Sequence, residues 1–303
     1  MTELRCNIAV VGAGAIGCYF GGLLARVGHA VTLIGRAPQV EAINKNGLQF
    51  ESLGRRQRIT LTATDRIAAV ADAALVLFCV KSPDTDGAAR AMAPHLAPEA
   101  IVLSLQNGVD NVERIRAHTK NRVLPVLVYA AAQIPAPGSV QHTGGGNLVI
   151  GSDLPREIAD VLASAGIPVR ISDNIDVELW TKLTMNCAYN AISALAQAPY
   201  GQMVAMSQVR DIMRDVVTEV VRVAEAKGVH LPGDIVEVTQ ELAKAMPVTV
   251  SSTAQDILKG KRTEIDHLNG AVVRLGEALG IATPVNRALN ALIKLREQTA
   301  RDS

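Results

Sequence analysis

Short apolar runs rich in β-branched residues recur through the first half of the chain and alternate with segments of helical character. Strands that read as continuous hydrophobic runs between helices indicate a parallel sheet covered by helices on both faces. The first half is therefore predicted to be α/β, with an added strand or hairpin over 138–151 and a last strand over 167–171. The other expected strands are 6–11, 30–34, 58–63, 74–80, 100–104 and 122–128, and the expected helices include 14–27, 37–46, 84–93 and 109–117.

In the second half the pattern changes, and apolar residues recur at helical spacing. The chain is therefore predicted to form two domains, an α/β domain over residues 1–172 and an all-helical domain over residues 173–303. The expected helices of the second domain are 175–198, 203–227, 234–246, 251–280 and 284–298. The apolar residues of 203–223 suit the interface of a homodimer, and packing inside the helical domain is the alternative use for them.

The composition is that of a folded globular protein without strong net charge. Of 303 residues, 49% are hydrophobic and 19% are charged, which excludes a disordered chain. Lys and Arg number 30 against 29 Asp and Glu, which gives a formal net charge of +1, and aromatic residues make up only 3%. Duplex binding needs clustered basic charge, and single-strand binding needs stacking rings. Nucleic acid is therefore not an expected partner.

Two uncharged stretches, 8–25 and 123–152, raise the question of a signal peptide or a membrane span. Five glycines weaken the first stretch as a continuous helix, and Glu3 precedes it where a signal peptide carries positive charge. Prolines and a glycine run interrupt the second stretch. We therefore expect no targeting segment and no membrane association.

The cysteine pattern predicts neither a disulfide framework nor a metal site. The four cysteines are Cys6, Cys18, Cys79 and Cys187. They lie far apart, form no C-x-x-C pair and have no histidine cluster nearby. Free thiols of this kind fit a reduced, cytoplasmic compartment.

The segment Gly12-Ala13-Gly14-Ala15-Ile16-Gly17 follows the first expected strand and opens the first expected helix. In that context G-x-G-x-x-G is the signature of a Rossmann-type dinucleotide-binding domain. Gly12 permits the tight turn, Gly14 lets a pyrophosphate approach the backbone, and Gly17 allows close packing of helix on strand. The free N–H groups of the helix N-terminus favour phosphate. The alternative is a glycine-rich turn that binds nothing.

The residue after the second strand bears on the choice of cofactor. NAD-specific folds carry an acidic residue there, which accepts a hydrogen bond from the ribose 2′-OH. Here the strand 30–34 is followed by Gly35 and Arg36. A guanidinium suits a 2′-phosphate, so we expect NADP(H). The alternative is that Arg36 is a solvated turn residue.

Two polar residues follow later strands of the same domain. Lys81 comes after the strand 74–80, and Asn107 comes after the strand 100–104. Open α/β sheets bind ligands beyond the carboxyl ends of their strands, so both side chains are candidates to contact a nicotinamide and a substrate. Asn107 is followed by Gly108, and an ordinary turn is the alternative role for this pair.

A polar stripe runs along the first helix of the second domain. Its members are Lys182, Asn186, Asn190 and Ser193, which lie on one face at 100° per residue. One Lys followed by amides and a hydroxyl is typical of a lined cleft, and a weakly polar solvent face or an amide-bonded seam is the alternative. A Lys in such a cleft can protonate a developing alkoxide. Glu264 is its expected partner, and Ser252 lies on the same or an adjoining helix.

Together with these residues, several segments resemble the ketopantoate reductase (2-dehydropantoate 2-reductase) family. The segments are GAGAIG, VKS at 80–82, LQNGVDN at 105–111, HTGGGNLVIG at 142–151, ELWTKLTMNCAYN at 178–190 and SSTAQDILKGKRTEIDHLNG at 251–270. The resemblance implies a Rossmann domain joined to an all-helical domain, with the active site in the interdomain cleft. It also implies reduction of the 2-keto group of ketopantoate to D-pantoate by NADPH, in the pathway to coenzyme A.

The resemblance also assigns roles to individual residues. It makes Lys182 the proton donor and Glu264 a neighbour of that Lys and of the nicotinamide ribose. It gives the cofactor a backbone contact at Ala131 and gives the catalytic cleft Lys81 and Asn107, the latter at both cofactor and substrate. The substrate-binding side chains that it implies are Asn186, Asn190 and Ser252.

Two positions depart from the family pattern. Family members often carry Asn where this chain has Tyr200 and Thr249, and both positions are expected at the hydroxyl or carboxylate end of the substrate. A different 2-keto acid is therefore the first alternative substrate. A reductase of the opine or 3-hydroxyacid dehydrogenase type would carry a His–Glu pair or a different helical-domain motif in place of Lys182 and Asn186, and neither is found. A non-catalytic NADP-binding redox sensor is a further alternative, although it would lose Lys182 and Glu264.

Overall fold

The computed structural model describes residues 5–299. The chain forms two compact units. The first contains the chain up to Asn107 together with Asn111–Ile175, and the second contains Gly108–Asp110 and the chain from Asp176 onward. Each unit has a hydrophobic interior of its own.

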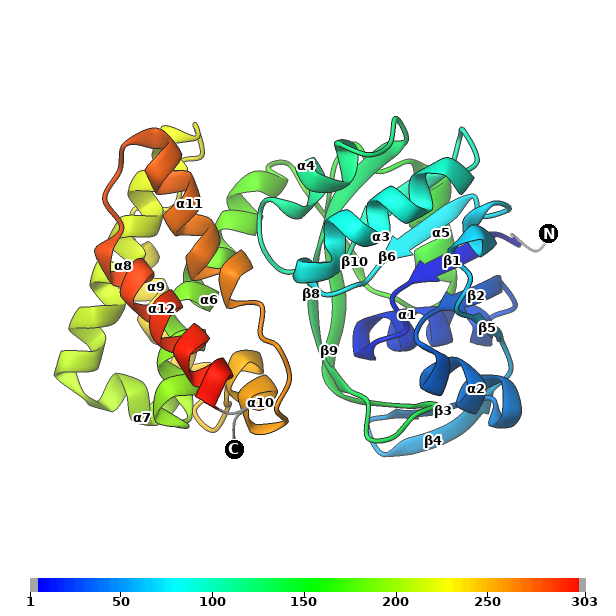
Figure 1. The fold of residues 1–303 in the computed structure, drawn as a ribbon, viewed down its shortest axis with the longest axis horizontal. Coiled ribbons are helices and arrows are strands. Elements are labelled where there is room, and N and C mark those ends of the chain that lie inside the picture. Colours follow the sequence, from blue (N-terminus) through cyan, green and yellow to red (C-terminus); the bar gives the residue numbers. More distant parts are fainter. Residues whose placement is uncertain (1–4, 300–303) are drawn as a thin grey trace. The chain divides into compact units, whose positions relative to one another are not determined.

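A ten-stranded sheet forms the centre of the first unit (Figure 1). Six of its strands are β1 (Asn7–Val11), β2 (Ala30–Ile34), β5 (Thr62–Thr64), β6 (Leu75–Phe78), β7 (Ile101–Ser104) and β8 (Arg122–Gln133). They run parallel in the order β5-β2-β1-β6-β7-β8. This is the 3-2-1-4-5-6 order of a doubly wound nucleotide-binding sheet, as predicted. The order reverses between β1 and β6, which is where such sheets bind ligands.

The rest of the sheet is mixed, and it includes the added strand expected over 138–151. Strand β9 (Ser139–Gly151) pairs antiparallel with β8 and parallel with β3 (Leu48–Ser52), and β4 (Arg55–Ile59) returns antiparallel to β3. The two residues between β3 and β4, Leu53 and Gly54, both have positive φ. A two-residue turn of this kind closes a hairpin, but it lacks the usual Asn-Gly or Asp-Gly signal. The strand expected over 58–63 is therefore divided between β4 and β5.

Helices cover both faces of the first unit's sheet, because alternate side chains of each strand point to opposite sides. On β1, Ile8 and Val10 join one hydrophobic cluster, while Ala9 and Val11 join the other. The first cluster includes side chains of α1 (Ala15–Arg26), α2 (Ala37–Asn46) and α5 (Arg156–Ser164), and the second includes those of α3 (Thr85–Met92) and α4 (Asn111–Arg116). The remaining elements of the unit are β10 (Val169–Ser172), which pairs with β9, and the short turns η1 (Ile67–Val70), η2 (Ser82–Asp84) and η3 (Ala93–His95).

The second unit is built from helices alone within the described residues. They are α6 (Ile175–Ala196), α7 (Tyr200–Ala205), α8 (Ser207–Ala226), α9 (Ile235–Ala245), α10 (Ser252–Leu258), η4 (Ile265–His267), α11 (Asn269–Leu279) and α12 (Pro284–Thr299). The helix expected over 203–227 begins earlier and is interrupted at Met206. The helix expected over 251–280 is broken after α10, where Gly260 adopts a left-handed conformation.

A buried carboxylate on α8 helps to fix α12. Glu219 is only 6% exposed, and its oxygens accept hydrogen bonds from the backbone N–H of Val285 at 2.8 Å and of Asn286 at 2.9 Å. They also accept one from Asn286 Nδ2 at 2.8 Å. These N–H groups belong to the first turn of α12 and have no partner inside that helix. Glu219 therefore caps α12 from a neighbouring helix.

The apolar side of α8 is used by the unit's own core. Met213, Val216 and Val220 are each fully buried in the second unit's hydrophobic cluster. The residues of 203–223 therefore give little support for a homodimer, which stays a prediction. No helix in the described part of the chain is long and apolar enough to cross a membrane.

Candidate active site

The glycine segment forms a tight turn between β1 and α1. Gly12 has φ of +109°, and a Cβ there would lie 2.6 Å from the backbone nitrogen of Val80, so only glycine fits. A Cβ at Gly17 would lie 2.1 Å from the carbonyl oxygen of Gly12, which shows how closely α1 packs on the turn. Gly14 caps α1, and a Cβ there would meet no atom within 4 Å. The turn thus leaves open space at the N-terminus of α1, as a pyrophosphate cradle requires.

Arg36 lies beside this turn at the end of β2. There is no room for a side chain at the preceding Gly35, because a Cβ atom there would lie 2.6 Å from the Cβ of Ala13 in the glycine segment. The Arg36 side chain is 91% exposed and lies 3.5 Å from Asp84, a contact too exposed to hold it firmly. A guanidinium is therefore available at the place where an adenosine ribose would lie in a doubly wound fold.

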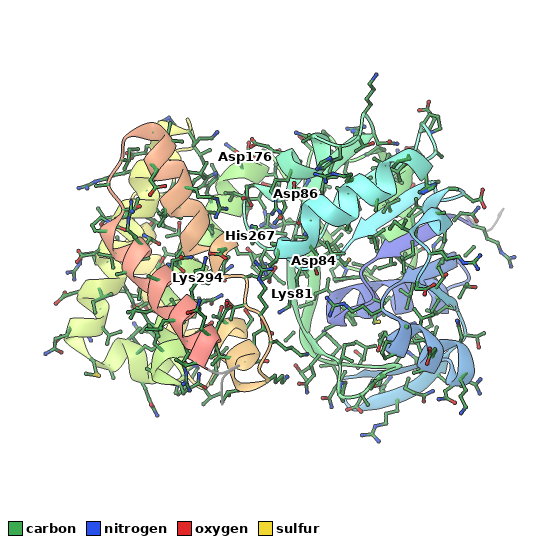
Figure 2. The ribbon with its side chains drawn as sticks, viewed as in Figure 1. Lys81, Asp84, Asp86, Asp176, His267 and Lys294 are labelled. Atoms are coloured by element: carbon green, nitrogen blue, oxygen red, sulfur yellow. The ribbon has the colours of Figure 1, made fainter. Side chains whose placement is uncertain are left out.

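The loops after β6 and β7 are bonded together. The carbonyl oxygen of Asn107 accepts hydrogen bonds from Ser82 Oγ at 3.1 Å and from Asn111 Nδ2 at 2.7 Å. Gln106 Nε2 donates to the carbonyl of Val80 at 3.0 Å. The half-buried Asn107 is thereby held next to the segment that carries Lys81, which is exposed and is labelled together with Asp84 in Figure 2.

Three residues that sequence reasoning missed hold these loops together. Gln106, Asn111 and Ser82 are all buried. Thr85 Oγ1 donates to Asn111 Oδ1 at 3.0 Å and accepts from Gln106 Nε2 at 2.7 Å. A buried polar residue in a loop carries no periodic signal in sequence, so only the folded chain reveals this network.

Ala131 lies on the long antiparallel β8–β9 pair. It is exposed and stands opposite Gly144, between two shifts in the β8–β9 register. Its carbonyl oxygen accepts a hydrogen bond from Thr143 Oγ1 at 3.3 Å. The irregular register gives this part of the strand pair accessible backbone, which a backbone contact to a cofactor requires.

In the second unit, the polar stripe on α6 divides into two parts. Lys182 and Asn186 are half-buried, whereas Asn190 and Ser193 are buried. Ser193 Oγ donates to the carbonyl of Ala198 at 2.9 Å and accepts from the backbone N–H of Ser251 at 3.2 Å. The stripe is therefore accessible at its beginning, while its end is bonded to the segment before α10.

Ser252 is the first residue of α10, and its side chain is exposed. The residue before it, Ser251, caps the helix, because its Oγ accepts from the backbone N–H of Ala254 at 3.1 Å. The same Oγ donates to the carbonyl oxygen of Asn190 at 3.1 Å. The structure thus brings Ser252 near Asn190, which the sequence alone could not do.

Glu264 and Lys182 lie close enough for their charges to interact. Glu264 is half-buried and comes directly before η4, in the break after α10. Burial lowers the pKa of Lys182 from its usual value to about 8, and the nearby Glu264 charge raises it in part. A cation with a pKa near 8 is mostly protonated at neutral pH yet gives up its proton more readily than an ordinary lysine. The structure thus brings Lys182 near the partner that the sequence predicts for it, and its role as an acid stays a prediction.

Tyr200 and Thr249, the two departures from the family pattern, are backbone partners. The N–H of Tyr200 donates to the carbonyl oxygen of Thr249 at 3.0 Å. The Tyr200 ring is buried and packs on the ring of Tyr189, with 4.3 Å between centroids. Burial raises the pKa of Tyr200 to about 12, so its phenol stays protonated.

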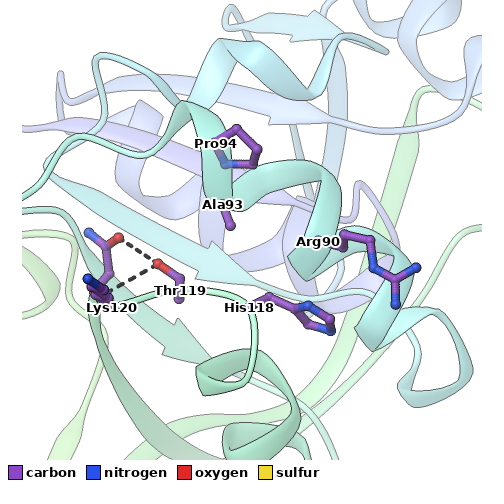
Figure 3. Close-up of a pocket in the computed structure, with 7 residues that line it drawn as sticks. Arg90, Ala93, Pro94, His118, Thr119 and Lys120 are labelled. Carbon is purple, nitrogen blue, oxygen red and sulfur yellow. Dashed lines mark hydrogen bonds between the residues drawn. The ribbon is translucent and has the colours of Figure 1, made fainter.

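A pocket elsewhere in the first unit contains none of the predicted site residues (Figure 3). It has a volume of about 420 Å³ and lies beside η3 and the turn between α4 and β8. That turn precedes β8, so the pocket lies at the amino ends of the strands, away from the edge where doubly wound sheets bind ligands. Its lining residues are Arg90, Ala93, Pro94, His118, Thr119, Lys120 and Asn121.

Known proteins match this chain over nearly its whole length. The family model described as "Ketopantoate reductase PanE/ApbA" matches residues 8–154, and "Ketopantoate reductase PanE/ApbA C terminal" matches residues 174–297. The chain is 35% identical over 302 residues to the 2-dehydropantoate 2-reductase of Halobacterium salinarum, which covers 96% of this chain and 99% of that protein.

Solved structures give the same result. The PanE/ApbA family ketopantoate reductase from Ralstonia eutropha JMP134 is 49% identical, with a TM-score of 0.94 over 97% of this chain and 99% of that one. D-mandelate dehydrogenase, solved with NADH and anilino(oxo)acetate, shares the fold at 24% identity, with a TM-score of 0.89 over 97% of this chain and 99% of that one. The protein belongs to the ketopantoate reductase PanE/ApbA family, a family of nicotinamide-dependent 2-keto acid reductases.

Proposed function

We propose that the protein reduces the 2-keto group of ketopantoate to D-pantoate with NADPH. The observation that carries the proposal is the half-buried Lys182, whose pKa is lowered to about 8 beside Glu264 on the accessible part of the α6 stripe. The family membership and the 49% identity to the Ralstonia protein support the same substrate. The proposal assigns cofactor binding mainly to residues 1–172, and substrate binding and catalysis mainly to residues 173–303.

The residues of the glycine turn fit a dinucleotide. Gly12, Gly14 and Gly17 provide a turn without side chains, and the open space at Gly14 admits a pyrophosphate at the N-terminus of α1. Arg36 is the residue for the 2′-phosphate, which favours NADPH over NADH. Lys81, Asn107, Glu264 and the backbone at Ala131 complete the set proposed for the cofactor. When bound, NADPH supplies the hydride that forms the new C–H bond at C2.

Lys182 provides the proton that completes the reduction. As the C=O double bond of the substrate becomes a single bond, its electron pair takes a proton from the Lys182 ammonium, which becomes a neutral amine. Glu264 favours the charged form of Lys182, so the neutral amine takes up a proton from solvent water after turnover. A positioned general acid contributes about 10²–10⁴ in rate.

The remaining polar groups are suited to hold the substrate. Asn186, Asn190 and Ser252 offer amide and hydroxyl donors, which pair well with a carboxylate and a hydroxyl group. Asn107 supplies a further amide from the first unit. Nothing in this set requires a metal ion, and we propose none.

A reductase of a different 2-keto acid is the second candidate. The observation that favours it is the apolar packing of Tyr200 on Tyr189, next to Thr249, at positions where family members often have amides. D-mandelate dehydrogenase, which has the same fold, acts on an aromatic acid by its name. A pocket with Tyr200 and Thr249 would bind a substrate with fewer polar groups than ketopantoate.

The test is an absorbance assay of NADPH oxidation with ketopantoate and with a panel of other 2-keto acids. NADH serves as the comparison cofactor, and the Lys182→Ala protein serves as the control for the acid. NADPH-dependent turnover of ketopantoate that collapses in the variant supports the proposal. Turnover of another keto acid alone would make that acid the substrate in place of ketopantoate. Tyr200 and Thr249 would then be the first positions to exchange. NADPH binding without turnover of any keto acid would favour the redox sensor.

A further inference from the structure

Two buried serines join α6 to α10 in the second unit. Ser193 on α6 is 0% exposed, and Ser251, the residue before α10, is 1% exposed. The N–H of Ser251 donates to Ser193 Oγ at 3.2 Å, and Ser251 Oγ donates to the carbonyl oxygen of Asn190 at 3.1 Å. Ser193 Oγ in turn donates to Ala198 at 2.9 Å. Each donor and acceptor in this link therefore has a partner within the described residues.

The hydrogen-bonded link connects two parts of the unit that are proposed to bind the substrate. On α6 it ends at the backbone of Asn190, whose amide is proposed to bind the substrate. On α10 it ends at Ser251, and the exposed Ser252 follows directly. Two hydrogen bonds through one residue fix both the distance and the direction of the α10 start relative to α6. Since α10 has only seven residues, its start depends on this cap for its position.

We propose that Ser193 and Ser251 are positioning residues that set Ser252 against Asn190, so that the two side chains grip one end of the 2-keto acid together. This inference rests on the proposed function, because it assumes that Asn190 and Ser252 bind the substrate. Neither Ser193 nor Ser251 touches the substrate in this proposal. They act through the backbone of the residues beside them.

Contacts other than the serine link also hold α10 on the second unit. Ala254 and Ile257 are buried in the second unit's core and hold the helix by apolar packing. Loss of the serine link should therefore loosen the start of α10 without unfolding the unit. The resulting defect is expected in substrate binding.

The experiment compares Ser251→Ala and Ser193→Ala with a matched control on the same helix. The control is Thr184→Ala, since Thr184 is also 0% exposed and its Oγ1 donates within α6, to the carbonyl of Trp180 at 2.8 Å. For each protein we would measure KM and kcat for the keto acid, the NADPH dissociation constant by fluorescence, and Tm. Ser251→Thr keeps the hydroxyl and the cap and is the rescue variant.

We expect KM for the keto acid to rise about tenfold in each serine variant, the equivalent of one lost hydrogen bond. The NADPH dissociation constant and kcat should change much less, and Ser251→Thr should retain most of the affinity. Ser193→Ala removes the hydrogen bond from the Ser251 N–H, and Ser251→Ala removes the bond to the carbonyl of Asn190, so the double variant should raise KM further than either single variant. Thr184→Ala should lower Tm while leaving KM near the wild-type value.

Equal KM values in the serine variants and in Thr184→Ala would overturn the inference, whatever their Tm. If Ser251→Ala does not fold, Ser193→Ala decides alone, because it keeps the Ser251 cap. The proposed function fails in a different way, namely if Lys182→Ala retains turnover. Loss of turnover in Lys182→Ala with unchanged KM in Ser193→Ala and Ser251→Ala would retain the function and reject the positioning role.

Discussion

At the scale of single residues, the chemistry depends on the environment of Lys182. A lysine on a solvated helix face keeps its ordinary pKa and is a poor acid near neutral pH. Here burial lowers the pKa to about 8, and the nearby Glu264 charge limits that shift. The helix periodicity predicts the face on which Lys182 lies, whereas its partner comes from a segment far along the chain. The acid role proposed for Lys182 therefore depends both on the local helix pattern and on the tertiary structure.

The pH dependence of turnover tests this pair. Because Lys182 must be protonated to act as an acid, kcat should fall as pH rises through about 8. In Glu264→Gln the charge that raises the Lys182 pKa is absent, so the same fall should occur at lower pH. The measurement is a pH profile of kcat for both proteins. An unchanged pH profile in Glu264→Gln would show that the Glu264 charge does not influence the pKa of Lys182.

The choice of cofactor is a second property of one residue. Arg36→Ala removes the guanidinium proposed for the 2′-phosphate, and a charge-assisted hydrogen bond contributes about 1.5–3 kcal/mol. We expect kcat/KM for NADPH to fall by roughly 10-fold to 150-fold, while kcat/KM for NADH stays near its starting value. Parallel kinetics with the two cofactors measure the effect. A similar loss with both cofactors would show that Arg36 does not bind the 2′-phosphate of NADPH.

At the scale of elements, the β1–α1 turn contains glycines that are present for two different reasons. Gly12 is required by the fold, since its φ is +109° and a Cβ would press on the backbone of Cys79 and Val80, just after β6. Gly14 has extended backbone that other residues adopt and open space around it. The structure offers no internal reason for Gly14, and the space that it leaves suits a ligand. The motif in sequence does not distinguish these two roles.

Alanine should therefore affect stability at Gly12 and cofactor binding at Gly14. Gly12→Ala should lower Tm, because an L-residue at positive φ costs about 1–2 kcal/mol and the new methyl group meets the backbone of Val80. Gly14→Ala should leave Tm unchanged and weaken NADPH binding. Thermal melts and NADPH titrations of both proteins test this. Wild-type affinity in a folded Gly14→Ala protein would argue against a pyrophosphate at this turn.

At the scale of the whole molecule, two units with separate cores share one chain. The chain passes from one unit to the other after Asn107, after Asp110 and after Ile175. Residues proposed for the cofactor lie mainly in the first unit, and those proposed for the substrate lie mainly in the second. Glu219 stabilises only the second unit, through the first turn of α12. The compartment and the oligomeric state of the protein stay predictions.

Calorimetry should distinguish the two units. Glu219→Ala leaves buried N–H groups of α12 without an acceptor, which costs about 2 kcal/mol or roughly 5–10 °C in the transition of the second unit. Saturating NADPH should instead raise the transition of the first unit, because a ligand stabilises the state that binds it. The check is differential scanning calorimetry with and without each change. A single two-state transition that both changes shift together would show that the units unfold as one.

The amino-acid pattern alone predicts the alternation of strands and helices, the glycine turn after the first strand, the change to an all-helical second half and the polar face of α6. These features depend on local periodicity and on residues adjacent in the chain, so they can be predicted without a fold. The β3–β4 hairpin was missed, because Leu53-Gly54 carries no common turn signal, and the break after α10 was missed, because helical spacing continues across it.

Only the tertiary structure decided that Glu264 meets Lys182, that Ser251 bonds to Ser193 and Asn190, and that Tyr200 is paired with Thr249. It also decided that Ser193 belongs to a structural link, although in sequence it continues the stripe of the cleft. The physical reason is that burial and contact between distant segments set the pKa of an acid and the position of a side chain. Neither quantity is encoded in the spacing of residues along one helix.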